Sequence, residues 1–266
     1  LGDPKRSAKF IAAISSAVAT NPGLQECDAG SILSGALLGE ALNLSPSPQL
    51  GQYYLVPFDQ KKYNEKTKKY EVISKKAQFQ LGYKGYIQLA IRSGQYKDID
   101  VIEVREGEYL GRNKITGKHQ FEFIEDEVER ENKPIIGYMA YFEYLNGFYK
   151  NLYWSKEKMQ KHALEYSQAY ASDVKKGTNY SFWSKDFDGM AFKTMLRQLI
   201  SKWGIMSIDM QEALTKDMSV IKEDGTCDYV DNQPIVSVPT EEKINTEVAE
   251  TTEKITEVKQ VNINEL

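Results

Sequence analysis

The sequence has 266 residues, of which 41% are hydrophobic, and a formal net charge of −4 at pH 7, so it can form one large domain or one domain with a tail. Its longest apolar runs, such as Ile135–Phe142, fall far short of the ~20 residues that cross a bilayer, and the first charged residues precede no apolar segment. Cys27 and Cys227 lie near opposite ends of the chain, which excludes a disulfide framework and a zinc-binding spacing. We therefore expect no membrane span, no signal peptide and a reducing, cytoplasmic environment.

Charge is distributed unevenly along the chain. Residues 217–266 include 12 acidic and 4 basic residues, whereas residues 1–216 include 26 acidic and 30 basic residues. Within that basic part, an acidic block at 100–131 separates two basic blocks. Such asymmetry favours a polyanionic partner, although mildly basic segments also occur in many enzymes.

The N-terminal part of the chain predicts helices around a β-hairpin. Asp3-Pro4 and Asp28 are suited to begin helices, and apolar residues then recur at helical spacing. A polar, lysine-rich turn at 60–69 separates two strand-like segments, and after Gly82 the period changes to that of a helix. We expect helices at 4–20, 29–44 and 82–94, and strands at 53–58, 70–73 and 77–81.

The C-terminal part predicts more strands and then helices. Asn146-Gly147 is a typical hairpin turn, Ser155 is a suitable N-cap, and Gly204 is suited to end a long helix. We expect strands at 99–104, 121–123, 135–144 and 148–154, helix after Ser155, and one helix at 182–203. The prediction is an α+β fold in which a small antiparallel sheet and hairpins pack with helices. Its core spans 1–223, and its acidic tail, 224–266, is too polar to fold alone.

Signals for enzyme chemistry are weak. The nearest match to a nucleotide-binding P-loop, Gly111 to Gly117-Lys118-His119, has one residue too many and ends in the wrong residue type. His119 and His162 are the only histidines, too few for most metal centres. Asp186 and Asp188 would point ~200° apart on a helix, so they suit its N-terminus better than a shared metal ion. We expect no catalytic residue, metal or cofactor, and a DNA-processing nuclease or a regulatory DNA-binding protein is the alternative.

Basic and amide side chains on three elements are suited to bind successive phosphates. They lie on the hairpin, on the helix at 82–94 and on the helix at 182–203, although each stripe is also compatible with a solvated face. On the last helix, Trp183, Phe187, Phe192 and Trp203 are expected in the core or in subunit contacts. The candidate DNA-binding residues are Lys75, Lys76, Gln78, Gln80, Lys84, Gln88, Arg92, Lys185, Lys193, Arg197 and Lys202.

Three blocks, taken together, resemble the RecT family: Gly51–Phe58 (GQYYLVPF) after Leu44-Ser45-Pro46, Phe79–Tyr86 (FQLGYKGY), and Asp186–Thr194 (DFDGMAFKT). They occur in order within residues 5–215. The resemblance implies a phage-type recombinase that works in a bacterial cytoplasm and anneals single-stranded DNA without ATP. It also implies a homo-oligomer, as a ring or helical filament, and helices that line a positively charged groove. It suggests a phage exonuclease and a host single-strand-binding protein as partners, with the tail in a regulatory role.

Overall fold

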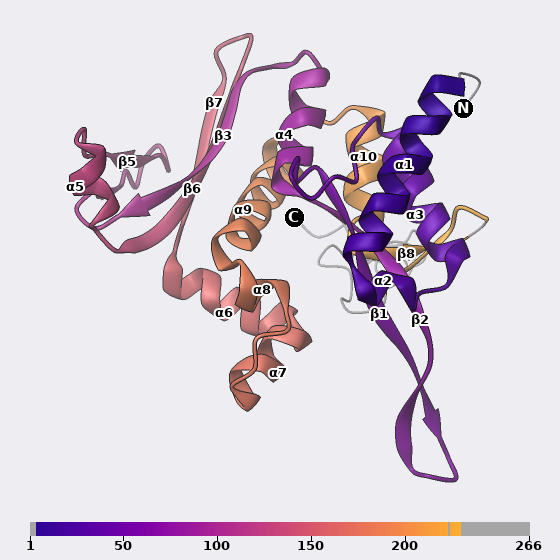
Figure 1. The fold of residues 1–266 in the computed structure, drawn as a ribbon. Coiled ribbons are helices and arrows are strands. Elements are labelled where there is room, and N and C mark those ends of the chain that lie inside the picture. Colours follow the sequence, from indigo (N-terminus) through magenta and orange to yellow (C-terminus); the bar gives the residue numbers. More distant parts are fainter. Residues whose placement is uncertain (1–3, 223, 230–266) are drawn as a thin grey trace, which may run out of the picture. The chain divides into compact units, whose positions relative to one another are not determined.

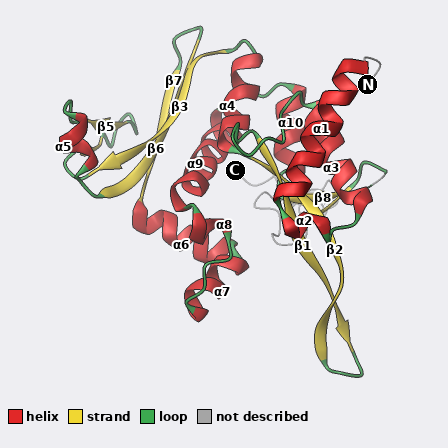
Figure 2. Ribbon diagram, in the orientation of Figure 1, coloured by secondary structure: helices red, strands yellow, loops and turns green. Residues whose placement is uncertain are grey.

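The computed structural model describes residues 4–222 and 224–229 (Figures 1 and 2). This part of the chain combines helices with small antiparallel sheets, which confirms the predicted α+β class. The helices are α1 (Pro4–Thr20), α2 (Pro22–Gln25), α3 (Ala29–Ala41), α4 (Tyr83–Arg92), α5 (Glu127–Glu131), α6 (Lys156–Tyr166), α7 (Gln168–Lys176), α8 (Phe182–Lys185), α9 (Phe187–Trp203) and α10 (Ile208–Lys216). The strands are β1 (Tyr53–Asn64), β2 (Lys69–Leu81), β3 (Tyr96–Arg105), β4 (Tyr109–Arg112), β5 (His119–Phe121), β6 (Ile135–Tyr144), β7 (Tyr149–Ser155), β8 (Ser219–Ile221) and β9 (Cys227–Tyr229).

Local capping signals explain where several helices begin. The carboxylate of Asp28 accepts a hydrogen bond from the Ser31 amide at 2.9 Å, and the Ser155 hydroxyl accepts one from the Lys158 amide at 3.2 Å. Each bond satisfies an amide that has no partner within its own helix. The predicted starts of α3 and α6 are therefore confirmed.

The strands form three antiparallel sheets, in the orders β1-β2-β8-β9, β3-β6-β7 and β4-β5. In the β1–β2 ribbon, Tyr53 pairs with Leu81 at one end and Asn64 pairs with Lys69 at the other. The strands thus continue through most of the turn expected at 60–69. The predicted turn was too long, because only residues 65–68 lie between the two strands. The lysine-rich polarity of this segment indicated a turn, but polar residues also pair in a two-stranded antiparallel ribbon, as Lys62 with Glu71 shows. Strand β5 also begins two residues earlier than the strand predicted at 121–123.

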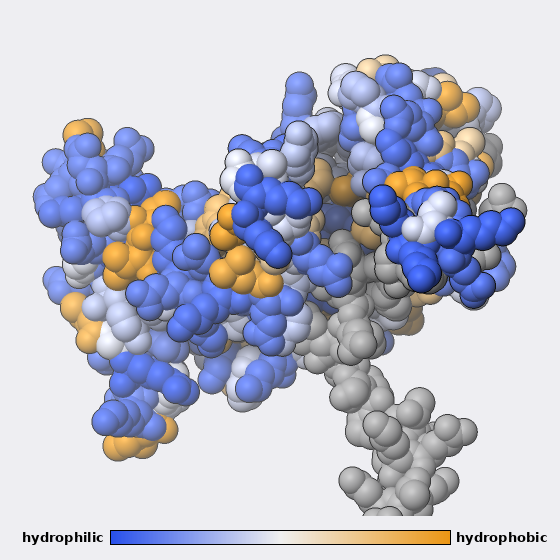
Figure 3. Space-filling view, turned by 90° about the horizontal axis from the view of Figure 1, so that it is seen from below, coloured by the Kyte–Doolittle hydropathy of each residue, from blue (hydrophilic) through white to orange (hydrophobic). Residues whose placement is uncertain are grey.

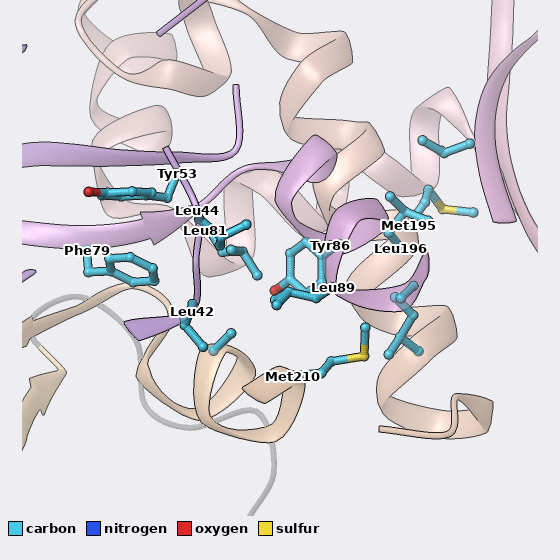
Figure 4. Close-up of a cluster of buried hydrophobic side chains, with 14 of the residues drawn as sticks. Leu42, Leu44, Tyr53, Phe79, Leu81, Tyr86, Leu89, Met195, Leu196 and Met210 are labelled. Carbon is cyan, nitrogen blue, oxygen red and sulfur yellow. The ribbon is translucent and has the colours of Figure 1, made fainter. Parts of the chain in front are cut away.

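A shared hydrophobic core connects the β1–β2 ribbon with the β3-β6-β7 sheet. Helix α9 contacts all three strands of that sheet and also contacts α4. The fully buried side chains of Tyr53, Phe79 and Tyr86 belong to this core, together with Leu196 of α9 (Figure 4). Because α9 packs on the β3-β6-β7 sheet and α4 packs on both α9 and β3, the polar residues on the outer face of α4 are held in defined positions.

The single helix predicted at 182–203 is interrupted at Asp186. Its backbone leaves the helical region, with φ −146° and ψ 76°, and its carboxylate accepts from the Gly189 amide at 3.0 Å. Asp186 therefore ends α8 and caps α9. Of the four aromatic residues expected in the core or in subunit contacts, Trp183 is buried and Phe187 and Phe192 are partly buried. Trp203 is 43% exposed and so lies outside the core, and its place in a subunit contact stays a prediction.

The described residues continue beyond the start of the expected tail. Residues 227–229 form β9, which pairs with β8 from Ser219↔Tyr229 to Ile221↔Cys227. The rest of that expected tail, 230–266, lies outside the described residues.

The length of the helices and the distribution of apolar side chains on the surface are two further features of the described residues. No helix within 4–222 and 224–229 is long and apolar enough to span a bilayer. Figure 3 shows hydrophobic residues in separate groups among hydrophilic ones on one face, and several large apolar side chains stay exposed.

Candidate nucleic-acid interface

The start of α4 packs directly on the loop that precedes β1. A Cβ atom at Gly82 would lie 2.1 Å from the Gly51 carbonyl oxygen, and one at Gly85 would lie 2.1 Å from the Gln52 carbonyl oxygen. The Gly82 amide also donates to the Gln52 carbonyl at 2.9 Å. Only glycine allows this approach, so the two glycines of the block Phe79–Tyr86 bring α4 and the loop together.

This junction places part of the predicted polar stripe beside a hollow. Lys84 and Gln88 are exposed on α4. With Gln49 and Gln52 they line a hollow of about 300 Å³, which Leu50 and Ile87 complete. Ammonium and amide groups can bind phosphate and sugar oxygens without reading the base sequence, and the two apolar side chains can contact bases.

Arg92, the third member of that stripe, is engaged elsewhere. Its guanidinium donates to the carbonyl oxygens of Leu42 at 2.9 Å and Asn43 at 3.3 Å. It therefore holds the segment that follows α3. Lys84 and Gln88 thus line the hollow, whereas Arg92 contacts backbone carbonyls away from it, and its role in DNA binding stays a prediction.

The third sequence block approaches the same region. Phe192 of α9 meets the ring of Tyr83 edge-on, with centroids 5.5 Å apart. Burial raises the pKa of Tyr54, and the nearby Asp186 carboxylate and Tyr83 raise it further. Side chains of β1, α4 and the α8–α9 junction thus lie close together, and the exposed Lys185 stands next to Asp186.

The next part of the region is a buried charge network centred on Asp217, whose side chain is fully enclosed. Its carboxylate accepts from the Lys193 ammonium at 2.9 Å and from the Arg197 guanidinium at 2.7 Å. It also accepts from the Tyr86 hydroxyl at 3.0 Å and the Leu81 amide at 2.8 Å. Together these groups tie α4, α9 and β2 to the segment that leads into β8.

The two cations of the network keep Asp217 ionised. Burial alone would raise its pKa, but Lys193, Arg197 and the hydrogen bonds outweigh that effect, so the pKa lies below its ordinary value. Burial lowers the pKa of Lys193, and the neighbouring carboxylate opposes the change. A buried ion pair of this kind depends on both partners.

The network corrects the expectation for two candidate residues. The Lys193 side chain is only 7% exposed and that of Arg197 is 31% exposed. Both cations form ion pairs with Asp217. The prediction that Lys193 contacts phosphate is therefore wrong, and Arg197 stabilises the fold through the same carboxylate. The sequence showed their spacing on one helix but not their partner, because Asp217 was counted with the acidic end of the chain.

Some of the candidate DNA-binding residues on the β1–β2 ribbon lie at the surface, and others lie in the interior. Lys75 forms an ion pair with Glu26, and Lys76 is half-buried beside a hollow of about 360 Å³. Gln78 is buried and donates to the Met218 carbonyl, and Gln80 donates to the Gln78 amide oxygen at 2.8 Å. Gln78 therefore supports the segment next to Asp217, and its burial contradicts its assignment to the DNA surface. Gln80 is half-buried, and its role at the DNA surface stays a prediction.

Lys202 lies far from Lys185 along the helical segment. The 17 residues of α9 correspond to roughly 25 Å, and Lys202 is in the last turn. Its ammonium lies 5.6 Å from the centroid of the Trp203 ring. The structure therefore brings together Lys84 and Gln88, places Lys185 beside Asp186 at the start of α9, and leaves Lys202 at the other end of α9. The residues that the sequence did not single out are Gln49, Gln52, Tyr54 and Asp217.

Metal ligands do not cluster in this region or elsewhere in the described ranges. Within 4–222 and 224–229, no group of three or more His, Cys, Asp or Glu residues is placed to hold a metal ion.

Comparison with known proteins identifies the family. The model of the RecT family matches residues 8–231. The chain belongs to the RecT family. A curated RecT-family relative, Protein RecT of Escherichia coli (strain K12), is 32% identical over 217 residues, which are 79% of this chain and 70% of the relative. Uncharacterized protein YqaK of Bacillus subtilis (strain 168) is 40% identical over 227 residues, 85% of this chain and 68% of that protein. Membership of the RecT family supports a protein of DNA recombination and single-strand annealing.

Proposed function

We propose that this RecT-family chain binds single-stranded DNA, oligomerises on it and anneals complementary strands without a nucleotide cofactor. The observation that carries the proposal is the hollow beside α4, where Lys84, Gln88, Gln49 and Gln52 present one ammonium and three amides. Gln52 and Lys84, which line it, come from two of the sequence blocks that resemble the family, and Phe192 of the third block contacts Tyr83 beside Lys84. Annealing requires strands to be held by their backbones with the bases free, and contacts to phosphate and sugar meet that requirement.

The DNA-binding surface that we propose is smaller than the set of candidates from the sequence. It contains Lys84 and Gln88 beside α4, and we extend it to the exposed Lys185 and to Lys76, which lines the second hollow. We leave out Lys193 because its ammonium is enclosed by Asp217. This selection makes a clear distinction between cations that bind DNA and cations that stabilise the fold.

Salt dependence of binding tests this distinction. Binding of a thymidine oligonucleotide would be followed by fluorescence anisotropy over a range of salt concentrations, for the wild type and for Lys84→Ala, Lys76→Ala and Lys193→Met. Each lost phosphate contact lowers the slope of log affinity against log salt by ~1. We expect this change for Lys84→Ala and Lys76→Ala, whereas a folded Lys193→Met protein keeps the wild-type slope. An unchanged slope for Lys84→Ala would contradict the proposed surface.

We also propose roles for the end of the chain and for partner proteins. Residues 232–266 include seven acidic and three basic residues, and we assign them to regulation rather than to annealing. A phage exonuclease and a host single-strand-binding protein are the partners that the family suggests. A pull-down with each purified partner, using the full chain and a chain that ends at Asp231, tests this assignment, and equal capture by both would contradict it.

A further inference from the structure

The β3-β6-β7 sheet carries different surfaces at its two ends. Strand β3 runs from Tyr96 to Arg105, and β6 runs in the opposite direction, with Val101 paired to Ala140. The β6–β7 turn therefore lies at the end where β3 begins.

Residues 122–131, which include α5, lie between the end of β3 and the start of β6, and Arg130 donates to the Glu103 carbonyl at 2.8 Å, so they lie at the opposite end (Figure 1). The β4–β5 hairpin that precedes them packs along β7, where the Asn151 side-chain amide donates to the His119 carbonyl at 2.9 Å.

Large apolar side chains are exposed at the first of these ends. We call this surface the aromatic end; it comprises Leu145, Phe148, Trp203, Ile205 and Ile208, which are between 43% and 82% exposed. The Tyr144 hydroxyl donates to the Trp203 carbonyl at 2.9 Å and accepts from the Ile205 amide at 2.6 Å. These bonds fix the end of α9 beside the β6–β7 turn. Exposed apolar groups of this kind are typical of protein-binding surfaces.

The aromatic end also carries positive charge. The ammonium of Lys150 lies 4.3 Å from the Trp203 ring centroid and that of Lys202 lies 5.6 Å from it. At the same end, the Lys97 ammonium forms an ion pair with the Glu143 carboxylate at 2.7 Å, so Lys97 adds little net charge to this surface. A partner for this surface should therefore combine apolar side chains with negative charge.

The opposite end of the same sheet has that combination. We call residues 122–131 the acidic end; they include six acidic residues and one basic residue, Arg130. Arg130 is paired internally with Glu108 at 2.6 Å, so it offsets little of the surface charge. Between the acids, Val128 is 72% exposed and Phe123 is 39% exposed.

We infer that the aromatic end of one copy binds the acidic end of the next copy. This inference rests on the proposed function, because it assigns the subunit contact of the DNA-bound oligomer. Aromatic and aliphatic side chains on one surface face apolar side chains on the other, and two lysines face carboxylates. Because the two surfaces differ and lie at opposite ends of a sheet, the contact is head-to-tail and can close into a ring or continue as a filament. Successive copies would be offset along the strand direction of the sheet.

Charge reversal with complementation tests the contact. One variant reverses the aromatic end (Lys150→Glu/Lys202→Glu), and the other reverses the acidic end (Glu125→Lys/Glu131→Lys). A matched control, Lys156→Glu/Lys161→Glu, reverses two exposed lysines on α6. Assembly on a long thymidine oligonucleotide would be measured by mass photometry over a range of protein concentrations.

Each reversed variant alone should need at least about tenfold more protein for half-maximal assembly, and the control should behave as wild type. An equimolar mixture of the two variants should regain wild-type assembly, because each then meets an oppositely charged partner; misfolded variants would not. Wild-type assembly by either variant alone, or no recovery in the mixture, would overturn the inference while leaving annealing intact. Failure of the wild type to bind the oligonucleotide would instead overturn the proposed function and this inference with it.

Discussion

Replacing Asp217 with Asn should destabilise the fold severely. The carboxylate accepts four hydrogen bonds, two of them from cations, at 2.7 to 3.0 Å. Asn is nearly the same size but carries no charge, so the Lys193 ammonium would remain buried without an anion. Removing one partner of a buried pair costs about 3–5 kcal/mol. That is a large part of the ~5–15 kcal/mol that stabilises a typical domain.

Chemical denaturation followed by tryptophan fluorescence measures this loss. The matched control is Asp228→Asn, which removes the carboxylate of a surface pair with Lys222 and should cost at most about 1 kcal/mol. Adding Lys193→Met to Asp217→Asn should recover a substantial part of the loss, because it removes the unpaired charge. A loss below about 1 kcal/mol for Asp217→Asn, or no recovery in the double variant, would refute the reasoning.

Three further predictions concern packing, pH and the end of the chain. Gly85→Ala should cost about 1–3 kcal/mol in the same denaturation assay, because its methyl group would meet the Gln52 carbonyl; wild-type stability would contradict this close approach. Burial lowers the pKa values of His119 and His162, so the unfolded state takes up protons first as pH falls below about 6.5. Stability should therefore decrease as pH falls through that region, and His119→Asn/His162→Asn should reduce the slope; an equal slope would assign the effect to other groups. A chain that ends at Asp231 should keep the wild-type free energy of unfolding, and a clear loss would show that the removed residues stabilise the core.

Predictions from the sequence succeeded where the determining interactions are local. Asp28 and Ser155 cap helices through amides three residues away, so the local pattern contains both partners. The break at Asp186 was missed because apolar spacing continues across it. Its signal was nevertheless present, since Asp186 is followed three residues later by Gly189, whose amide it caps.

The errors at the candidate site have a different cause. The spacing of Lys193 and Arg197 on a helix indicates a common face, but it does not say whether that face meets water or a buried carboxylate. Their partner is 24 and 20 residues further along the chain and reaches them only after α10 has reversed the chain direction. In the same way, the apolar spacing of α9 includes Trp203, but spacing alone does not decide between the core and a subunit contact, and the 43% exposure of this residue leaves only the second.

The expected DNA surface was only partly predictable for the same reason. Lys84 and Gln88 follow from the periodicity of α4 alone. Gln49 and Gln52 join them only because Gly82 and Gly85 allow close backbone contact with the preceding loop. The sequence blocks contain Gln52, Gly82 and Gly85, but the meeting point of these residues is a tertiary feature.

Strand annealing without a nucleotide is the most direct test of the central claim. Two complementary oligonucleotides, one with a fluorophore and the other with a quencher, would be mixed with the full chain in the absence of ATP, and strand lengths would be checked on a denaturing gel. We predict that the wild type accelerates quenching with both strands intact, and that Lys84→Ala/Gln88→Ala accelerates it less. No acceleration by the wild type would contradict annealing, and shortened strands would favour a nuclease.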